Sequence, residues 1–296
     1  MEIYNRFKDL FKLRKELNTC KNQVERIESN INKLFQFQNY EMINKGKPTR
    51  LNNFELKIFS QNGEDGIILE ILKRFENIQG RIVEIGIEDG TECNSANLLI
   101  NFGWKGLLIE GDEDYAKKAN SYYCEKLKLK ESVDIKCKFI STRNFSEVLR
   151  KSNYHEGIDI LSIDVDGVDY WLWESLDSQI RPKLLIIEYN AYLPYDKAIT
   201  VPDDEGFERY KKHQSGYYFG ASLKALEKLG KEKGYSLVGC DSRGVNSFFV
   251  ADEFLGNRFE VLAAHEAYFP LTSGTKIRPK PEEAFSIVKE MPFVEV

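Results

Sequence analysis

Long hydrophobic runs are absent from this sequence, and its cysteines are few and scattered. No apolar stretch approaches the roughly 20 residues of a membrane-spanning helix, and the charged N-terminus is unlike a signal peptide. The five cysteines form no C-x-x-C pair; they are Cys20, Cys93, Cys124, Cys137 and Cys240. We therefore expect reduced thiols in a cytoplasmic protein.

An excess of positive charge is also missing. The net charge is −5 and no basic stripe dominates, which argues against a general nucleic-acid binder. Histidine is scarce, and of His155, His213 and His265 we expect the first at the surface. A chain of 296 residues with 42% hydrophobic content can form one large α/β domain plus an appendage.

Residues 1–45 lack glycine and proline and carry a regular apolar seam. Its members, three and four residues apart, are Leu10, Leu13, Leu17, Cys20, Val24, Ile27, Ile31 and Leu34. This heptad pattern predicts a helix, and a lone polar helix of this length needs a partner. We expect a coiled coil that joins two copies into a homodimer, with packing on the chain's own catalytic domain as the alternative. A linker is predicted at Lys45–Asn53.

The stretch Arg81–Asp114 has the pattern of a nucleotide-binding βαβ unit. A short apolar strand leads into a glycine turn at Gly86 and Gly90, a helix is predicted over 94–102, and a second strand ends at Glu110. Glycines let the backbone approach a ligand closely, and an acid on the second strand can accept both ribose hydroxyls. The spacing to Glu110 is near the roughly 20 residues expected for such an acid.

The glycine turn favours a ligand without a pyrophosphate. Its sequence is EIGIEDG, and the carboxylates of Glu88 and Asp89 would repel the phosphates of NAD. Glu84 before the single Gly86 suits an ammonium group. S-adenosylmethionine (SAM) offers an amino acid, a sulfonium and a ribose, and fits this pattern better.

Further strands bring acidic residues to the same edge of the expected sheet. We predict strands over 137–140, followed by Ser141, over the apolar run after 158, and over 184–190. Ligands bind at the carboxyl ends of the strands in a doubly wound sheet. Four polar side chains should converge there, namely Asp164, Asp166, Glu188 and Asn190. A capped strand-to-helix turn is the alternative interpretation of the first two acids.

Two loops and a hairpin complete the domain. The polar turn at 60–63, before a helix that begins at Glu64, either closes over the ligand or only caps that helix. The long aromatic segment 191–221 predicts a substrate-binding lid. A helix at 222–232 precedes a closing hairpin of strands 236–239 and 247–251, with Asn246 at its mouth. Three parts result, with the boundaries 1–45, 46–255 and 256–296, the last a tail that packs on the domain.

Six segments in series resemble the class I SAM-dependent methyltransferases. Within that class they resemble the FkbM-like and sugar O-methyltransferase groups of bacterial surface-polysaccharide (capsule) and natural-product pathways. The segments are SQNGEDG at 60–66, VEIGIEDG at 83–90, GWKGLLIEGD at 103–112, SIDVDGVDYWLW at 162–173, YFGASLKAL at 218–226 and GYSLVGCDSRGVNSFFV at 234–250. The resemblance implies a Rossmann-like, doubly wound, seven-stranded α/β sheet with a reversed final hairpin. The turn lacks the G-x-G of many methyltransferases, so the contacts at 87–89 stay open.

The resemblance also implies roles for individual residues. Glu84 and Gly86 would contact the methionine part of SAM, Glu110 the ribose, Asp112 and Ser141 the adenine, and Asp164 the sulfonium side. The full set of expected cofactor contacts is Gln61, Gly63, Glu64, Glu84, Gly86, Gly90, Asn94, Glu110, Gly111, Asp112, Ser141 and Asp164. The implied ligands of a divalent cation, Mg²⁺ or Mn²⁺, are Asp164, Asp166, Glu188 and Asn190.

Methyl transfer from a sulfonium to a hydroxyl is an in-line displacement, so the enzyme must align three atoms. A metal ion can lower the pKa of the hydroxyl, and a base then takes its proton. Candidate bases are Asp166, His213 and His265. The implied acceptor is a sugar or sugar nucleotide, and a small phosphorylated or phosphoramidate acceptor stays open. The competing hypotheses are an NAD-dependent dehydrogenase or epimerase and a non-catalytic coiled-coil scaffold.

Overall fold

The computed structural model describes residues 50–154, 156–272 and 278–296 and scattered positions before them (Lys12, Arg14, Lys15, 17–21, Val24 and Ile31). The chain divides into two units, Met1–Pro48 and Thr49–Val296. In the first unit the described members of the apolar seam, Leu17, Cys20, Val24 and Ile31, are helical and exposed. The other seam residues and most of the expected linker lie outside the described residues, so the coiled coil stays a prediction.

The second unit contains a seven-stranded sheet with the order β3-β2-β1-β4-β5-β8-β7. The strands are β1 (Arg81–Ile85), β2 (Lys105–Glu110), β3 (Val133–Cys137), β4 (Ile160–Ile163), β5 (Leu184–Glu188), β7 (Tyr235–Cys240) and β8 (Asn246–Ala251). Strands β1 to β5 pair in parallel, whereas β8 runs antiparallel to both β5 and β7. The expected doubly wound sheet with a reversed final hairpin is thus confirmed.

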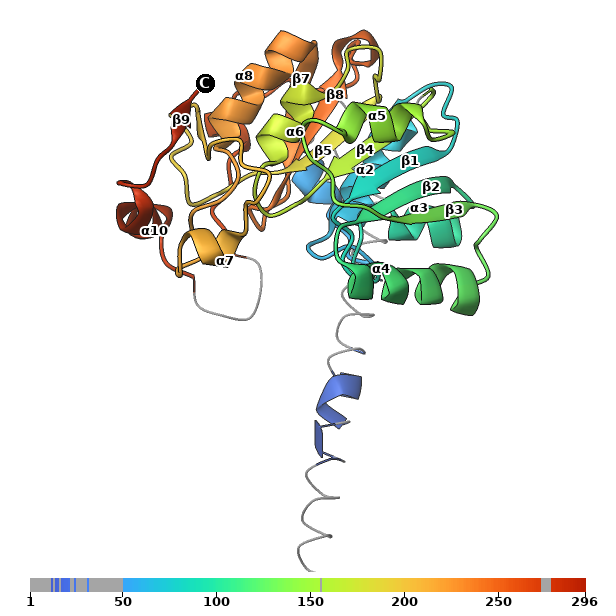
Figure 1. Ribbon diagram of the computed structural model, residues 1–296. Coiled ribbons are helices and arrows are strands. Elements are labelled where there is room, and N and C mark those ends of the chain that lie inside the picture. Colours follow the sequence, from blue (N-terminus) through green and yellow to red (C-terminus); the bar gives the residue numbers. More distant parts are fainter. Residues whose placement is uncertain are drawn as a thin grey trace, which may run out of the picture. The chain divides into compact units, whose positions relative to one another are not determined.

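Helices cover both faces of this sheet (Figure 1). Those on one face are α2 (Glu64–Arg74), α3 (Ala96–Asn101) and α4 (Glu113–Asn120), the last continued by a π-helical turn at Ser121–Lys126. Those on the other face are α5 (Phe145–Arg150), α6 (Asp169–Ser175), α8 (Leu223–Lys233) and α9 (Ala264–Ala267). Short 3-10 helices lie at Leu51–Phe54, which overlaps the end of the expected linker, and at Asp252–Phe254.

Alternating apolar side chains explain the two helical layers. In β5, Leu185 and Ile187 belong to one buried cluster and Leu184 and Ile186 to the other, because successive side chains of a strand point to opposite faces. Nearly continuous apolar strands of this kind are typical of a sheet covered on both sides. Strand β1 departs from the pattern at the buried Glu84, which lies on the face covered by α3.

The direction of each strand decides which residues meet at the carboxyl edge of the sheet. Strands β1, β2, β4 and β5 all end there, so Gly86, Glu110, Asp164 and Glu188 lie along one edge. Strand β8 is reversed and therefore begins at the same edge, where Asn246 pairs with Glu188. The chain reversal thus adds a residue from late in the sequence to the strand ends.

The third strand differs from the expectation. It spans Val133–Cys137 and not 137–140, and it pairs with β2 at the edge of the sheet. Only Val133 is fully buried in this strand, while Phe139 is exposed. An edge strand needs few apolar residues. The prediction followed the apolar pair at 139–140 and therefore placed the strand too late in the sequence.

The segment 191–221 and the tail form one cover beside the sheet. The segment contains β6 (Ile199–Thr200) and α7 (Arg209–Lys212), and the tail contains α10 (Pro281–Val288) and β9 (Val294–Glu295). Strands β6 and β9 pair antiparallel, and the buried Val288 of α10 packs with Val201 and Tyr218. Figure 1 shows α7, α10 and β9 together at one end of the sheet. The tail therefore packs against the segment 191–221.

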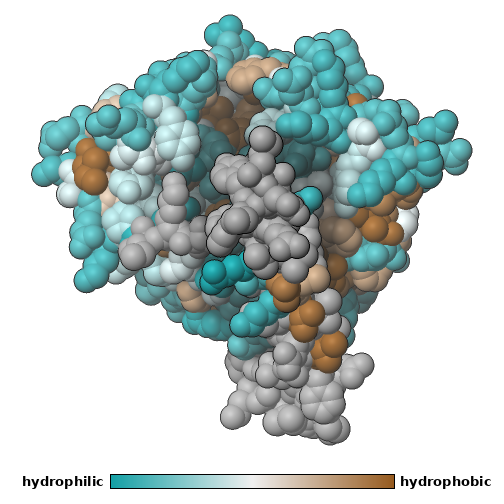
Figure 2. All heavy atoms as spheres, turned by 90° about the horizontal axis from the view of Figure 1, so that it is seen from below, coloured by the Kyte–Doolittle hydropathy of each residue, from teal (hydrophilic) through white to brown (hydrophobic). Residues whose placement is uncertain are grey.

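Within the described part of the chain, no helix is long and apolar enough to cross a membrane. The face seen in Figure 2 carries mainly hydrophilic residues, and hydrophobic residues form small separate groups between them.

The SQNGEDG segment is a tightly bonded loop that fixes the start of α2. One carboxylate oxygen of Asp65 accepts hydrogen bonds from the backbone N–H groups of Ile58, Phe59 and Ser60, each at 2.8 Å. The first 3-10 helix packs directly on Gly66, where an added Cβ would lie 1.8 Å from the Phe54 carbonyl oxygen. The Asp65 side chain therefore fixes this loop against the first turn of α2.

We predict that Gly66→Ala destabilises the protein. A Gly→Ala change in a helix with open space stabilises it by about 1 kcal/mol. At Gly66 the clash with backbone atoms should instead lower the free energy of unfolding by about 1–3 kcal/mol. Urea unfolding followed by circular dichroism measures this, with Gly206→Ala as the control, because a Cβ there meets only Asp204 Oδ1 at 3.5 Å. Equal midpoints for both variants would contradict the packing argument.

Candidate active site

A cavity of about 600 Å³ opens at the carboxyl edge of the sheet. Its lining comes from the ends of β1, β2, β4 and β5, the start of β8, the loop before α2, and the cover formed by 191–221 and the tail. Of the predicted cofactor and metal residues, it is lined by Gln61, Glu64, Glu84, Gly86, Asn94, Glu110, Asp112, Asp164, Asp166 and Glu188. Sites for small organic ligands typically have this size and place in α/β proteins.

Negative charge dominates this cavity. Its acidic lining residues are Glu64, Glu84, Glu88, Asp89, Glu92, Glu110, Asp112, Asp164, Asp166 and Glu188, against the basic Arg209 and Arg278. Low-dielectric walls with one sign of charge attract ligands of the opposite sign. The cavity therefore favours a cationic ligand and disfavours a pyrophosphate.

The turn after β1 requires glycine at position 86. Gly86 has φ of +80°, and an added Cβ would lie 1.5 Å from the carbonyl oxygen of Asp164. Its N–H donates to the carbonyl of Ile109 at 2.9 Å. Backbone from β1, β2 and β4 meets at this point, and the absence of a side chain leaves the adjoining cavity open.

Glu84 is occupied by the backbone of its own turn. Its two oxygens accept hydrogen bonds from the N–H groups of Asn94 and Ser95, at 2.9 and 2.8 Å. Burial raises the pKa of the Glu84 carboxyl, and these donors offset part of that effect. Glu84 thus holds the start of α3 in place while it lines the cavity floor, and the predicted contact with a ligand ammonium would be additional to this role.

Glu110 lies where a ribose acid is expected, at the end of β2. Its oxygens accept hydrogen bonds from the N–H groups of Glu88 and Asp112, at 2.7 and 2.9 Å. A carboxylate can accept about four hydrogen bonds, so two hydroxyl donors can still be added. Asp112 in turn caps α4 by accepting from the N–H groups of Asp114 and Tyr115.

The loop before α2 is tied to the last strand at the rim of the cavity. Glu64 accepts from the Asn62 N–H at 2.7 Å and from Asn246 Nδ2 at 2.9 Å. The Asn246 side chain is buried, and its Oδ1 has no hydrogen-bond partner in the structure. An unsatisfied buried acceptor beside a cavity is a position where a ligand donor would gain a hydrogen bond.

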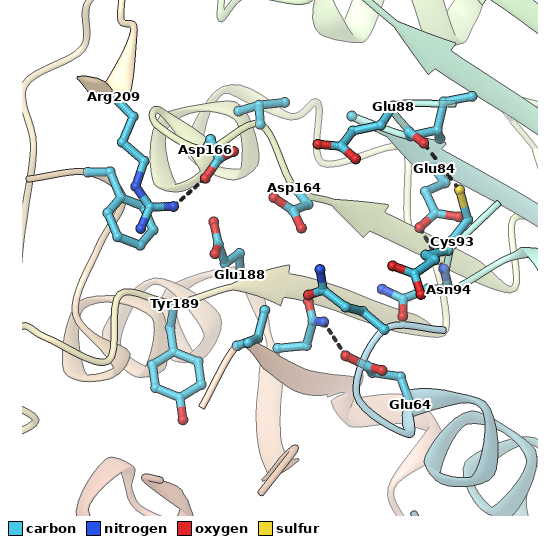
Figure 3. A pocket seen from close by; sticks show the side chains of 18 of the residues that line it. Glu64, Glu84, Glu88, Cys93, Asn94, Asp164, Asp166, Glu188, Tyr189 and Arg209 are labelled. Carbon is cyan, nitrogen blue, oxygen red and sulfur yellow. Dashed lines mark hydrogen bonds and ion pairs between the residues drawn. The ribbon is translucent and has the colours of Figure 1, made fainter. Parts of the chain in front are cut away.

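Three acids converge at the other half of the cavity, where Asp164, Asp166 and Glu188 point toward one another (Figure 3). Burial and the neighbouring carboxylates raise the pKa values of Asp164 and Glu188 well above their usual range. Asp166 has the unfavourable φ of +55°, and Asp169 holds this turn by accepting from the N–H groups of Val165 and Gly167. The capping role considered for the first two acids therefore belongs to Asp169.

Arg209 of α7 faces this group of acids. Its Nη1 donates to Asp166 Oδ1 at 2.5 Å, its Nε donates to the Gly216 carbonyl at 2.7 Å, and its guanidinium lies 3.5 Å from the centre of the Phe219 ring. The charge of Glu188 contributes to raising the pKa of Arg209. Sequence analysis placed this residue only in a long lid and did not identify it as part of the site.

The four expected metal ligands do not form a coordination site. Asn190 does not line the cavity, because its Oδ1 accepts from the Tyr192 N–H and its Nδ2 donates to the carbonyls of Tyr217 and Phe219. Among the described residues, no group of three or more His, Cys, Asp or Glu is arranged to hold a metal ion. The donor set therefore does not fit the divalent cation that the resemblance implies.

The predicted histidine bases are not brought to the cavity. His213 ends α7 and its Nδ1 lies 2.8 Å from Ser215 Oγ, while His265 is exposed on α9. His155 lies outside the described residues. Four predicted cofactor contacts, Gly63, Gly90, Gly111 and Ser141, also do not line the cavity. Gly63 is the N-cap residue of α2, and the Ser141 N–H donates to Asn144 Oδ1 at 3.0 Å.

Glu88 and Asp89, the turn carboxylates expected to face a ligand, both line the cavity. Glu88 has φ of +49°, and burial together with nearby acids raises its pKa. The aromatic residues Tyr189, Tyr210 and Phe219 line the half near Arg209. The aromatic segment 191–221 was expected as a lid, but spacing alone did not show that its residues Tyr210 and Phe219 reach the cavity. Tyr189 lies before this segment.

Solved methyltransferases have folds similar to this one. A putative O-methyltransferase from Klebsiella pneumoniae is 16% identical, with 62% of this chain and 77% of that chain covered and a TM-score of 0.38. An O-methyltransferase from Bacillus cereus in complex with S-adenosylhomocysteine is 18% identical, with 72% and 94% covered and a TM-score of 0.40. NcsB1, an O-methyltransferase from neocarzinostatin biosynthesis in complex with SAM, is 14% identical, with 58% and 49% covered and a TM-score of 0.37.

No protein-family model and no curated protein matches this chain. At such identities and TM-scores the similarity is one of general fold. The strand order of the chain itself defines that fold.

We predict that Glu84→Gln destabilises the protein through the α3 turn. The amide can accept from only one of the two N–H groups and presents its own NH₂ to the other. Leaving a buried donor unsatisfied should lower the free energy of unfolding by about 1–3 kcal/mol, measured by urea denaturation. The control is Glu113→Gln, an exposed acid paired with Lys117, which should change stability by less than about 0.5 kcal/mol. Equal free energies of unfolding for the two variants would contradict a structural role of Glu84.

Proposed function

We propose that this protein is a SAM-dependent methyltransferase that transfers a methyl group to a hydroxyl of a sugar. The observation that carries the proposal is the strongly acidic cavity at the carboxyl edge of the sheet, with Glu110 at the end of β2. SAM contains a sulfonium and an ammonium, and both favour an acidic surrounding. NAD carries a pyrophosphate, which the same carboxylates would repel.

In this proposal the cofactor occupies the half of the cavity formed by β1 and β2. Gly86 lets the ligand approach the backbone, Glu110 accepts from the ribose hydroxyls, and Asp112 lies beside the adenine. Glu84 lines this half and would contact the ligand ammonium. The bound cofactor supplies an electrophilic methyl group, and the residues present fit a ligand of this size and charge.

The acceptor would occupy the half near the cover. Tyr210 is exposed and offers aromatic surface, and Asp166 and Glu188 offer acceptors for hydroxyl donors. Flat apolar surfaces combined with a few charged acceptors suit a polyhydroxylated ring. A sugar nucleotide of capsule or surface-polysaccharide biosynthesis, as the resemblance implies, is part of this proposal.

The chain's own groups can accept the hydroxyl proton. Asp166 is paired with Arg209, which weakens it as a base. Glu188 has a pKa well above its usual range because of burial and the adjacent acids, so its carboxylate is a stronger base than an exposed one. We propose Glu188 as the base, in place of the histidines. The proposed mechanism uses no metal ion, because the Asn190 amide is hydrogen-bonded to backbone and Asp166 is bonded to Arg209.

The N-terminal seam completes the proposal. Leu17, Val24 and Ile31 are more than half exposed on the first unit, and a second copy of the same helix would bury them in a coiled-coil homodimer. Sedimentation velocity tests this directly, and a monomer at micromolar concentration would contradict it.

We predict that Glu110→Ala weakens SAM binding by about tenfold or more, because hydrogen bonds to a charged group contribute about 1.5–3 kcal/mol. Isothermal titration calorimetry with SAM measures the affinity. Glu113→Ala is the control, since Glu113 is exposed and does not line the cavity. The wild-type protein with SAM should add one methyl group to a suitable sugar nucleotide in a mass-spectrometric screen. No SAM binding to the wild type would refute the proposed function.

A further inference from the structure

The three acids near the cover need a compensating positive charge. Asp164, Asp166 and Glu188 face one another (Figure 3), and carboxylates at short range cannot all ionise without a cation nearby. In metal-dependent enzymes that cation is a divalent ion held by several oxygen ligands. Here the predicted set of metal-binding residues is incomplete, because both groups of the Asn190 amide bond to backbone.

The guanidinium of Arg209 is fixed against these acids from three directions. Nη1 bonds to Asp166, Nε bonds to the Gly216 carbonyl, and the plane of the group rests on the Phe219 ring. The Arg209 side chain is 17% exposed, so it is ordered by packing as well as by charge. Arginine is always protonated and loses little freedom when its planar group is held this way.

The segment that carries Arg209 is itself anchored. Tyr218, close to Gly216 and Phe219 in sequence, is 2% exposed and packs with Val201 and Val288 of the cover. The Trp171 Nε1 of α6 donates to the Val201 carbonyl at 2.7 Å and joins the cover to the sheet. The position of the guanidinium therefore depends on the packed cover and not on a loose loop.

We propose that Arg209 is the resident cation of the Asp164, Asp166 and Glu188 group and takes the place of a divalent metal ion. This inference deepens the proposed function, on which it rests for the assignment of these acids to the acceptor half. Arg209 is a positioning residue: it orients Asp166 and offsets the charge of Glu188. It follows that the wild-type protein needs no divalent ion. Removal of the guanidinium leaves the three carboxylates without a cation, and a divalent ion that keeps water ligands can then bind to them without Asn190.

The test is a titration with Mn²⁺, followed by the electron paramagnetic resonance signal of free Mn²⁺, on the full chain without SAM. The wild type should bind Mn²⁺ only weakly. Arg209→Ala should bind one Mn²⁺ per chain at least about tenfold more tightly, because an unpaired cluster of carboxylates attracts a hard cation. Arg209→Lys should stay close to the wild type, since its ammonium retains the charge.

Two controls keep the result specific. Arg209→Ala combined with Asp166→Asn should lose the gained Mn²⁺ site. Arg181→Ala, which breaks an ion pair with Glu253, should gain none. Tight stoichiometric Mn²⁺ binding by the wild type that is lost in Asp166→Asn would overturn the proposal, and so would the absence of any gain in a folded Arg209→Ala.

The titration also separates this inference from the proposed function. Mn²⁺ binding is measured without SAM, so a failure to bind SAM leaves the result on Arg209 intact. A protein that binds SAM but also binds Mn²⁺ tightly keeps the methyltransferase proposal and loses only the inference on Arg209.

Discussion

The concentration of like charge at one edge of the sheet is the constraint on which this site depends. Parallel strands end together, and here each of β1, β2, β4 and β5 contributes an acid at or near its end. The protein offsets this repulsion in three ways. Glu84 and Glu110 accept backbone N–H groups, and Asp166 bonds to Arg209. Glu188 and Asp164 keep strongly raised pKa values. The carboxylates that stay ionised give the cavity a negative charge, which favours a cationic ligand.

The two halves of the cavity are built from different parts of the chain. The half that we propose for the cofactor comes from contiguous sequence around β1 and β2, in which Gly86 permits the close approach of three backbone segments. The half that we propose for the acceptor is assembled from distant segments, because β9 near the C-terminus pairs with β6 and α10 packs behind Phe219. A change in the tail can therefore alter the second half without a change in the first.

The sequence allowed prediction of features that depend on local pattern. The buried strands and the Gly86 turn follow from apolar runs and glycine spacing, and the position of Glu110 follows from the βαβ geometry. Features that depend on contacts between distant segments could not be predicted from the sequence. The third strand was misplaced because an edge strand needs little apolar character. Asn190 was expected as a ligand, but its Oδ1 accepts from the Tyr192 N–H and its Nδ2 donates to the distant carbonyls of Tyr217 and Phe219. Arg209 became part of the site only because the cover folds back over the strand ends, a contact that no spacing rule encodes.

The most direct test of the central claim, that this acidic cavity selects SAM over a pyrophosphate-containing cofactor, is thermal unfolding of the wild-type protein with each ligand. A ligand at about one hundred times its Kd stabilises the folded state by about 2.7 kcal/mol, which raises Tm by several degrees in a domain of this size. We expect such a rise with SAM and none with NAD at equal concentration. A rise with NAD and none with SAM would contradict it.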